Sequence, residues 1–149
     1  MNRRHRARRL ALQGLCCLDV QGGRVADLVA QFIDDSKEPA ATLASAHKLL
    51  TAAVAQREES DGILARHAHH WDLSRLAMVD RNILRLAVAE MRGGQTPPKV
   101  ALSEAIRLAQ EFSSAESPRF VNGVLDAVMK EILASRRPAA EPADSTDEE

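Results

Sequence analysis

The sequence predicts an all-helical protein of about seven helices, and three observations lead to that fold class. Apolar residues recur at the three- and four-residue spacing of a helix along almost the whole chain. Aromatic residues make up 3% of the 149 residues, so the core must be aliphatic, which favours helices over a β-sandwich. No segment alternates apolar and polar residues as a half-buried strand does. The length suits one domain with room for two lobes.

Four helices are predicted in the first half of the chain. An apolar stripe over residues 7–18 marks the first helix, and the glycines at 22–23 end it. Residues 25–33 follow the full helical template, residues 43–54 mark a third helix, and a fourth surrounds residues 63–64. The apolar residues expected to line the inner face of the second helix are Val25, Leu28, Val29, Phe32 and Ile33.

Three further helices are predicted in the second half. Apolar residues over 76–91 lie on one helical face, and Gly93–Gly94 ends that helix. Pro98 suits the first turn of the next helix, whose apolar face runs to residue 112. Ser117 can cap the last helix, with Pro118 in its first turn and apolar spacing as far as residue 133.

Asn122–Gly123 lies inside the period of the last helix. Asn-Gly is a hairpin signal between strands, but here the helical spacing continues on both sides. Because a glycine inside a helix costs about 1 kcal/mol relative to alanine, we expect a neighbouring helix or a ligand to approach closely there.

Charge is distributed unevenly along a chain whose net charge is -1. Residues 1–19 carry five arginines and one aspartate, a sum of +4, whereas residues 138–149 carry five carboxylates, a sum of -5. The 15 basic and 15 acidic residues between them cancel. A basic head on a neutral body is typical of a protein that binds a polyanion, and the acidic, proline-containing tail is predicted to be disordered.

The basic head begins with "NRRHRARRLALQGL", where arginines occupy the start of a helix and oppose its dipole. In a helix that begins near Arg4, the side chains of His5, Arg6, Arg8 and Arg9 are expected to point away from the apolar stripe and form a cluster in solvent. Arginine matches phosphate oxygens, which indicates a nucleic-acid contact. The alternative is a solvated charge run that only aids solubility.

Other features indicate no enzyme, metal or membrane role. Cys16 and Cys17 are adjacent, which indicates reduced thiols rather than a disulfide. No apolar run approaches the roughly 20 residues of a membrane span, so a mature cytoplasmic protein is expected. The histidines of "HAHHW" at 67–71 lack a complementary ligand set and are expected to have a surface or packing role. No glycine-rich phosphate loop or nucleophile elbow is present, and no cofactor is predicted.

Two longer stretches resemble a known family. "WDLSRLAMVDRNILRLAVAEM" and "KVALSEAIRLAQEFSSAESPRFVNGVLDAV", together with "RRHRAR" near the N-terminus, closely resemble the bacterial NusB family of transcription antitermination proteins. The resemblance covers about residues 3–134. It implies two small helical bundles packed together within one domain of residues 1–137, with lobes of about 1–73 and 74–137 and the acidic tail at 138–149.

The resemblance also implies a function and its partners. It implies a non-catalytic factor that binds single-stranded boxA-type RNA of nascent ribosomal RNA transcripts with ribosomal protein S10 (NusE), within the antitermination complex of RNA polymerase. A homodimer is a further possibility in this family. Two alternatives remain open: an RNA-binding module associated with ribosomal RNA methylation, and a helical adaptor that binds only proteins.

Matching positions carry the family's functional residues onto this chain. The implied RNA-binding residues are Arg4, His5, Arg6, Arg8, Glu116, Ser117, Arg119 and Phe120. The spacing of Phe120 also suits a core anchor of the last helix. The implied contacts with S10 are Cys16, Asp80 and Glu90, for which capping and surface ion pairs are the alternative roles.

Overall fold

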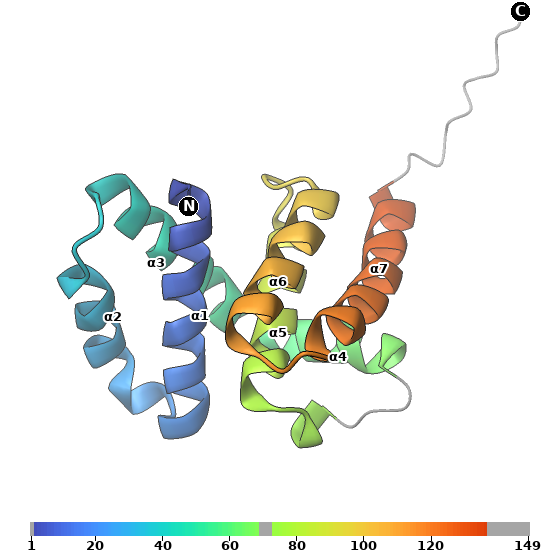
Figure 1. Ribbon diagram of the computed structural model, residues 1–149, viewed down its shortest axis with the longest axis horizontal. Coiled ribbons are helices and arrows are strands. Elements are labelled where there is room, and N and C mark those ends of the chain that lie inside the picture. Colours follow the sequence, from blue (N-terminus) through green and yellow to red (C-terminus); the bar gives the residue numbers. More distant parts are fainter. Residues whose placement is uncertain (1, 69–72, 137–149) are drawn as a thin grey trace, which may run out of the picture.

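The computed structural model describes residues 2–68 and 73–136, and these form seven α-helices and two short 3₁₀ turns, with no strand among them (Figure 1). The prediction of an all-helical fold of seven helices is therefore confirmed. The helices are α1 (Arg3–Gln21), α2 (Ala26–Asp35), α3 (Ala40–Ala55), α4 (Arg57–His67), α5 (Met78–Gly93), α6 (Pro98–Phe112) and α7 (Ser117–Arg136), with 3₁₀ turns at η1 (Gly23–Val25) and η2 (Leu73–Arg75). The acidic tail at 138–149 lies outside the described residues.

Glycine and proline set the helix ends as the sequence predicts. Gly22 follows α1 with a φ of 85°, and Gly94 follows α5 with a φ of 82°. Residues with a Cβ rarely adopt this left-handed region, so glycine ends these helices at little cost. Pro98 is the first residue of α6, where its missing N–H leaves no helical hydrogen bond unmade.

The helices form two groups, and α5 is the helix of the second group that packs against the first. In Figure 1, α1, α2 and α3 lie on the left, whereas α5, α6 and α7 lie on the right. Helix α5 packs against both α1 and α3 and against α6 and α7. Helix α4 packs against α5 and α7, so the second group begins at Arg57, earlier in the chain than the lobe boundary near residue 73 that the sequence suggests.

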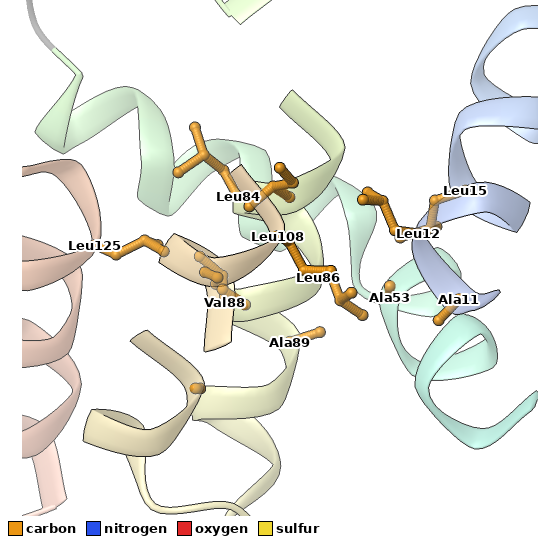
Figure 2. Close-up of a cluster of buried hydrophobic side chains, with 14 of the residues drawn as sticks. Ala11, Leu12, Leu15, Ala53, Leu84, Leu86, Val88, Ala89, Leu108 and Leu125 are labelled. Carbon is orange, nitrogen blue, oxygen red and sulfur yellow. The ribbon is translucent and has the colours of Figure 1, made fainter. Parts of the chain in front are cut away.

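Helix α5 is buried all round rather than on one face. Every residue from 82 to 91 is buried, although the apolar spacing alone predicts a single inner stripe. Figure 2 shows the reason: Leu86 lies toward the α1 and α3 side chains Leu12 and Ala53, while Val88 lies among the residues of the other group near Leu108. A helix that separates two packed groups has no solvent face of its own.

Helix α2 buries a narrower face than its spacing predicts. Val29 and Ile33 are buried, at 3% and 0% exposure, but Leu28 and Phe32 are 70% and 51% exposed. The expectation that all five apolar residues face the core is therefore wrong for these two. Because α2 lies at the outside of the first group, no other helix of the described residues covers its outer edge. Leu28 and Phe32 instead border a shallow groove of about 360 Å³ between α2 and α1.

Gly123 lies inside α7, as the helical period predicts. The close approach of a neighbouring helix that we expected there is absent from the described residues, since a Cβ at Gly123 would meet nothing within 4 Å. Gly14 of α1 provides that kind of approach instead. A Cβ there would lie 3.0 Å from Val29 Cγ1 and 3.2 Å from Leu50 Cδ2.

Candidate nucleic-acid interface

The first turn of α1 presents two arginines to solvent. Asn2 precedes the helix and its side-chain oxygen accepts a hydrogen bond from the backbone N–H of His5 at 2.8 Å, so the helix is capped despite the cations that follow. Arg3 and Arg4 are exposed, and neither pairs with a carboxylate among residues 2–68 and 73–136. Their guanidinium groups are therefore available to an anionic partner.

His5 lies in the same turn but is completely buried. Its ring contacts two carboxylates of α6, with Nδ1 at 2.7 Å from Glu104 Oε1 and Nε2 at 2.9 Å from Glu111 Oε1. Glu104 and Glu111 are seven residues apart, or two helical turns, so they lie on the same face of α6. The imidazole therefore bridges these two turns and joins the start of α1 to α6.

Arg8 is also buried, at 5% exposure, and makes a two-pronged ion pair. Its Nε and Nη2 donate to the two carboxylate oxygens of Glu90 on α5, each at 2.8 Å, and its Nη1 lies 3.8 Å from Glu104. Burial alone would lower the pKa of Arg8, but the hydrogen bond and charge of Glu90 outweigh it and raise that pKa. Arg8 is therefore a fixed internal cation that joins α1 to α5.

Arg6 and Arg9 have intermediate exposure. Arg6 Nε donates to Glu38 Oε1 at 2.7 Å, which ties the basic N-terminal arm, residues 3–9, to the segment before α3. The Arg9 guanidinium lies over the ring of Phe112, 5.4 Å from its centroid, and 4.0 Å from Glu111. Both cations keep part of their surface in solvent.

These contacts correct the prediction of a cluster in solvent. His5 and Arg8 do not point into solvent, because the first turns of α1 lie against α5 and α6 and meet three carboxylates there. The apolar stripe of α1 is thus only part of its inner face, which also contains charged residues. Only Arg4 of the four arm residues carried over from the family is fully on the surface, with Arg6 half-buried.

The candidate RNA-binding residues at the start of α7 are likewise part exposed and part buried. Glu116 and Arg119 are exposed, whereas Ser117 is 4% exposed. The Ser117 hydroxyl donates to Asp80 Oδ2 at 3.0 Å and is 2.8 Å from the Ser113 hydroxyl. Phe120 is partly buried against the core, which agrees with its alternative role as a helix anchor.

Helix α5 holds both the start of α1 and the start of α7. Arg8 binds Glu90 near one end of α5, and Ser117 binds Asp80 near the other end. Ten residues separate Asp80 from Glu90, which corresponds to about 15 Å along the helix. These two buried contacts therefore hold α1 and α7 at different turns of the same helix, while Arg9 lies beside Phe112 at the end of α6.

The three residues predicted to contact S10 lie largely inside the molecule. Asp80 and Glu90 are 9% and 8% exposed, and their carboxylates are occupied by serines and by Arg8. Their burial corrects the expectation of charged groups on the surface. Cys16 is partly buried, and burial, together with the nearby Asp19 charge, raises the pKa of its thiol to about 11, so it stays protonated at neutral pH.

Sequence reasoning missed an ion-pair network at the other end of α1. Asp19 accepts hydrogen bonds from Arg81 Nη2 at 2.8 Å and from Asn82 Nδ2 at 2.9 Å, and lies 3.4 Å from Arg85 Nη1. Burial alone would raise the pKa of Asp19, but these hydrogen bonds and arginine charges lower it. The signal in the sequence was a single carboxylate at the end of an otherwise apolar stripe.

The histidine-rich segment contributes a structural contact. His67 Nε2 lies 2.6 Å from Glu131 Oε1, and Arg66 binds the other oxygen of Glu131, so α4 is joined to α7. His69 and His70 lie outside the described residues. Within the described parts of the chain, no three His, Cys, Asp or Glu side chains are placed to hold a metal ion. None of the helices described there is long and apolar enough to cross a membrane.

Comparison with known proteins gives consistent matches over most of the chain. The model of the NusB family matches residues 5–130. The transcription antitermination protein NusB of Solibacter usitatus is 43% identical over 142 residues, which cover 94% of this chain and 97% of that protein. The same protein of Koribacter versatilis is 42% identical over 137 residues, with 90% and 93% covered.

Solved structures share the fold. NusB of T. maritima superposes with a TM-score of 0.75 at 29% identity, over 88% of this chain and 92% of that one. A chain from the crystal structure of antitermination factors NusB and NusE in complex with dsRNA superposes with a TM-score of 0.78 at 30% identity, over 88% of this chain and 98% of that one. The protein described here therefore belongs to the NusB family of transcription antitermination proteins.

Proposed function

We propose that this protein is an antitermination factor that binds boxA-type RNA of nascent ribosomal RNA transcripts together with ribosomal protein S10 (NusE). Its relatives carry the name of antitermination proteins, and a structural neighbour comes from a complex of NusB and NusE with dsRNA. The observation that carries the RNA part is the pair of exposed arginines Arg3 and Arg4 on a capped, firmly anchored helix. The proposed role involves no catalytic step and is carried out in the cytoplasm, where transcripts are made.

Some of the family's RNA-binding positions lie on the surface and are proposed to contact RNA, whereas others are buried and support that surface. Arg4 and the exposed part of Arg6 take backbone phosphates, and Arg119 takes a phosphate at the start of α7. Glu116 beside it can accept hydrogen bonds from base edges, and the part of the Phe120 ring that remains in solvent can contact a base. The family positions at His5, Arg8 and Ser117 act from inside, by fixing the helices that carry these groups.

The proposed S10 contact lies on the outer surface of α1 near Cys16. A neutral, partly buried thiol offers apolar contact rather than charge. Asp80 and Glu90 support this surface indirectly, because Asp80 holds the start of α7 and Glu90 holds α1.

Titration of fluorescently labelled boxA RNA, with and without S10, tests the proposal. We expect Arg4→Ala and Arg119→Ala each to weaken binding and to reduce the salt slope by about 0.7, as loss of one phosphate contact to single-stranded RNA requires. Arg24→Ala is the matched control. Arg24 is also exposed, but it lies beyond the C-terminal end of the 19-residue α1, a helix about 28 Å long whose other end carries Arg4.

The same titration separates the alternatives. A protein-only adaptor would bind S10 but leave the RNA signal unchanged at every salt concentration. Equal losses for Arg24→Ala and Arg4→Ala would show that the attraction is unspecific and would reject the proposed surface. Absence of RNA binding both with and without S10 would reject the function itself.

A further inference from the structure

The environment of His5 requires a particular protonation state. Its two ring nitrogens lie 2.7 and 2.9 Å from carboxylate oxygens of Glu104 and Glu111, and the ring is fully buried, so water cannot take the place of either contact. An ionised carboxylate only accepts hydrogen bonds, whereas a neutral imidazole has a single N–H. Both contacts are satisfied together only when both ring nitrogens carry a proton, that is, when His5 is an imidazolium.

Two carboxylates contact the His5 ring, and arginines lie near these carboxylates. From α6, Glu104 and Glu111 face it, and Arg107 lies 3.3 Å from Glu104. From α1, Arg8 lies 3.8 Å from Glu104 and Arg9 lies 4.0 Å from Glu111.

On α5, Glu90 is paired with Arg8. Burial alone would raise the pKa of Glu104, but the hydrogen bond from His5 and the neighbouring arginines lower it, which keeps this acceptor ionised.

We propose that protonated His5 is a positioning residue that clamps the first turn of α1 onto α6 and so strengthens the binding of RNA. The proposal rests on the proposed RNA-binding function. His5 lies next to Arg4 and Arg6 in the chain, and its backbone N–H donates the capping hydrogen bond to Asn2 Oδ1. Holding His5 in place therefore holds the backbone that carries these two arginines. Loss of one ring proton leaves a nitrogen lone pair facing a carboxylate in a buried site. One contact must then open, and the first turn loosens.

RNA affinity of the wild type and of two His5 variants, measured at one pH and constant ionic strength, tests the clamp. His5→Arg keeps a permanent cation with several donors and should bind near the wild-type affinity. His5→Gln lacks the charge and should bind about fivefold more weakly, because one charged hydrogen bond is lost. His67→Gln, which removes the histidine that joins α4 to α7, should keep the wild-type affinity.

A measurement without RNA tests the clamp directly. Nitrogen-15 NMR of the full chain should show both ring nitrogens of His5 protonated at neutral pH. A neutral tautomer there, or equal RNA affinities of the wild type and His5→Gln, would overturn the clamp while leaving RNA binding intact. Absence of RNA binding by the wild type, even with S10, would overturn the proposed function and the positioning role together. A protonated ring in that case would show that the loss lies in RNA recognition rather than in the buried contacts.

Discussion

At the scale of single residues, Arg4 and Arg8 show how position decides the role of an arginine. They are four residues apart and so lie on the same side of α1. Arg4 is exposed without a carboxylate partner among the described residues, whereas Arg8 reaches the paired oxygens of Glu90 in the interior. Arginines with the same chemistry and neighbouring positions on the helix thus belong to the proposed RNA surface in one case and to the packed interior in the other.

This difference predicts opposite consequences of the same substitution. Arg8→Ala leaves Glu90 buried without its partner and should lower the free energy of unfolding by about 3 kcal/mol or more. Arg4→Ala should change it by less than about 0.5 kcal/mol, since no internal contact is lost. Urea denaturation measures both, and each variant serves as the control for the other. Equal stability losses would contradict the buried pair.

At the scale of the helix, two glycines within α-helices have different surroundings. Gly14 lies where α1 meets α2 and α3, with side chains 3.0 and 3.2 Å from the position of a Cβ, whereas Gly123 on α7 has open space. A helix interior favours alanine over glycine by about 0.5–1 kcal/mol when space allows. Helix propensity is therefore opposed by packing at Gly14 and unopposed at Gly123.

We expect Gly123→Ala to raise the free energy of unfolding by about 0.5–1 kcal/mol. Gly14→Ala should gain less or lower the stability, because Val29 and Leu50 must shift to admit the methyl group. Thermal and urea unfolding of the pair provide the comparison. If Gly123→Ala is more stable yet binds RNA more weakly, the bound RNA approaches this glycine. Destabilisation by Gly123→Ala would show that the helix is not open there.

At the scale of the whole molecule, charged contacts join the two groups of helices at both ends of α1. Arg8 and His5 attach its N-terminal turns to α5 and α6, and Asp19 attaches its C-terminal turn to Arg81 and Arg85 of α5. These contacts flank the apolar seam of Figure 2, so they set how α1 lies across the second group.

The Asp19 network predicts acid sensitivity. Because the pKa of folded Asp19 lies below its usual value, its contribution is fully present above about pH 4 and is lost as the pH falls through the folded pKa. Asp19→Asn should therefore be less stable than wild type at neutral pH, and this difference should shrink in acid. Urea midpoints across the acid range measure it. Asp126→Asn, which removes only an exposed pair with Lys130, is the control, and an equal effect in both would reject the prediction.

Local pattern determined much of this protein. The helical period, the glycines after α1 and α5 and the proline that begins α6 act on the backbone within a few residues, so the seven helices and most of their ends could be predicted. The stretches that resemble NusB proteins were sufficient to identify the family, which the match over residues 5–130 confirms. The excess of arginine at the N-terminus correctly marked α1 as the basic helix.

Only the tertiary structure decided which of those arginines face solvent. Burial depends on the neighbour across the interface, and Glu90, Glu104 and Glu111 come from helices some 80 to 100 residues further along the chain. The same dependence on packing buries α5 on every side and leaves Leu28 and Phe32 of α2 exposed. Periodicity reports which side of a helix is apolar, whereas the depth of a side chain and its charged partner are set by how the helices pack together.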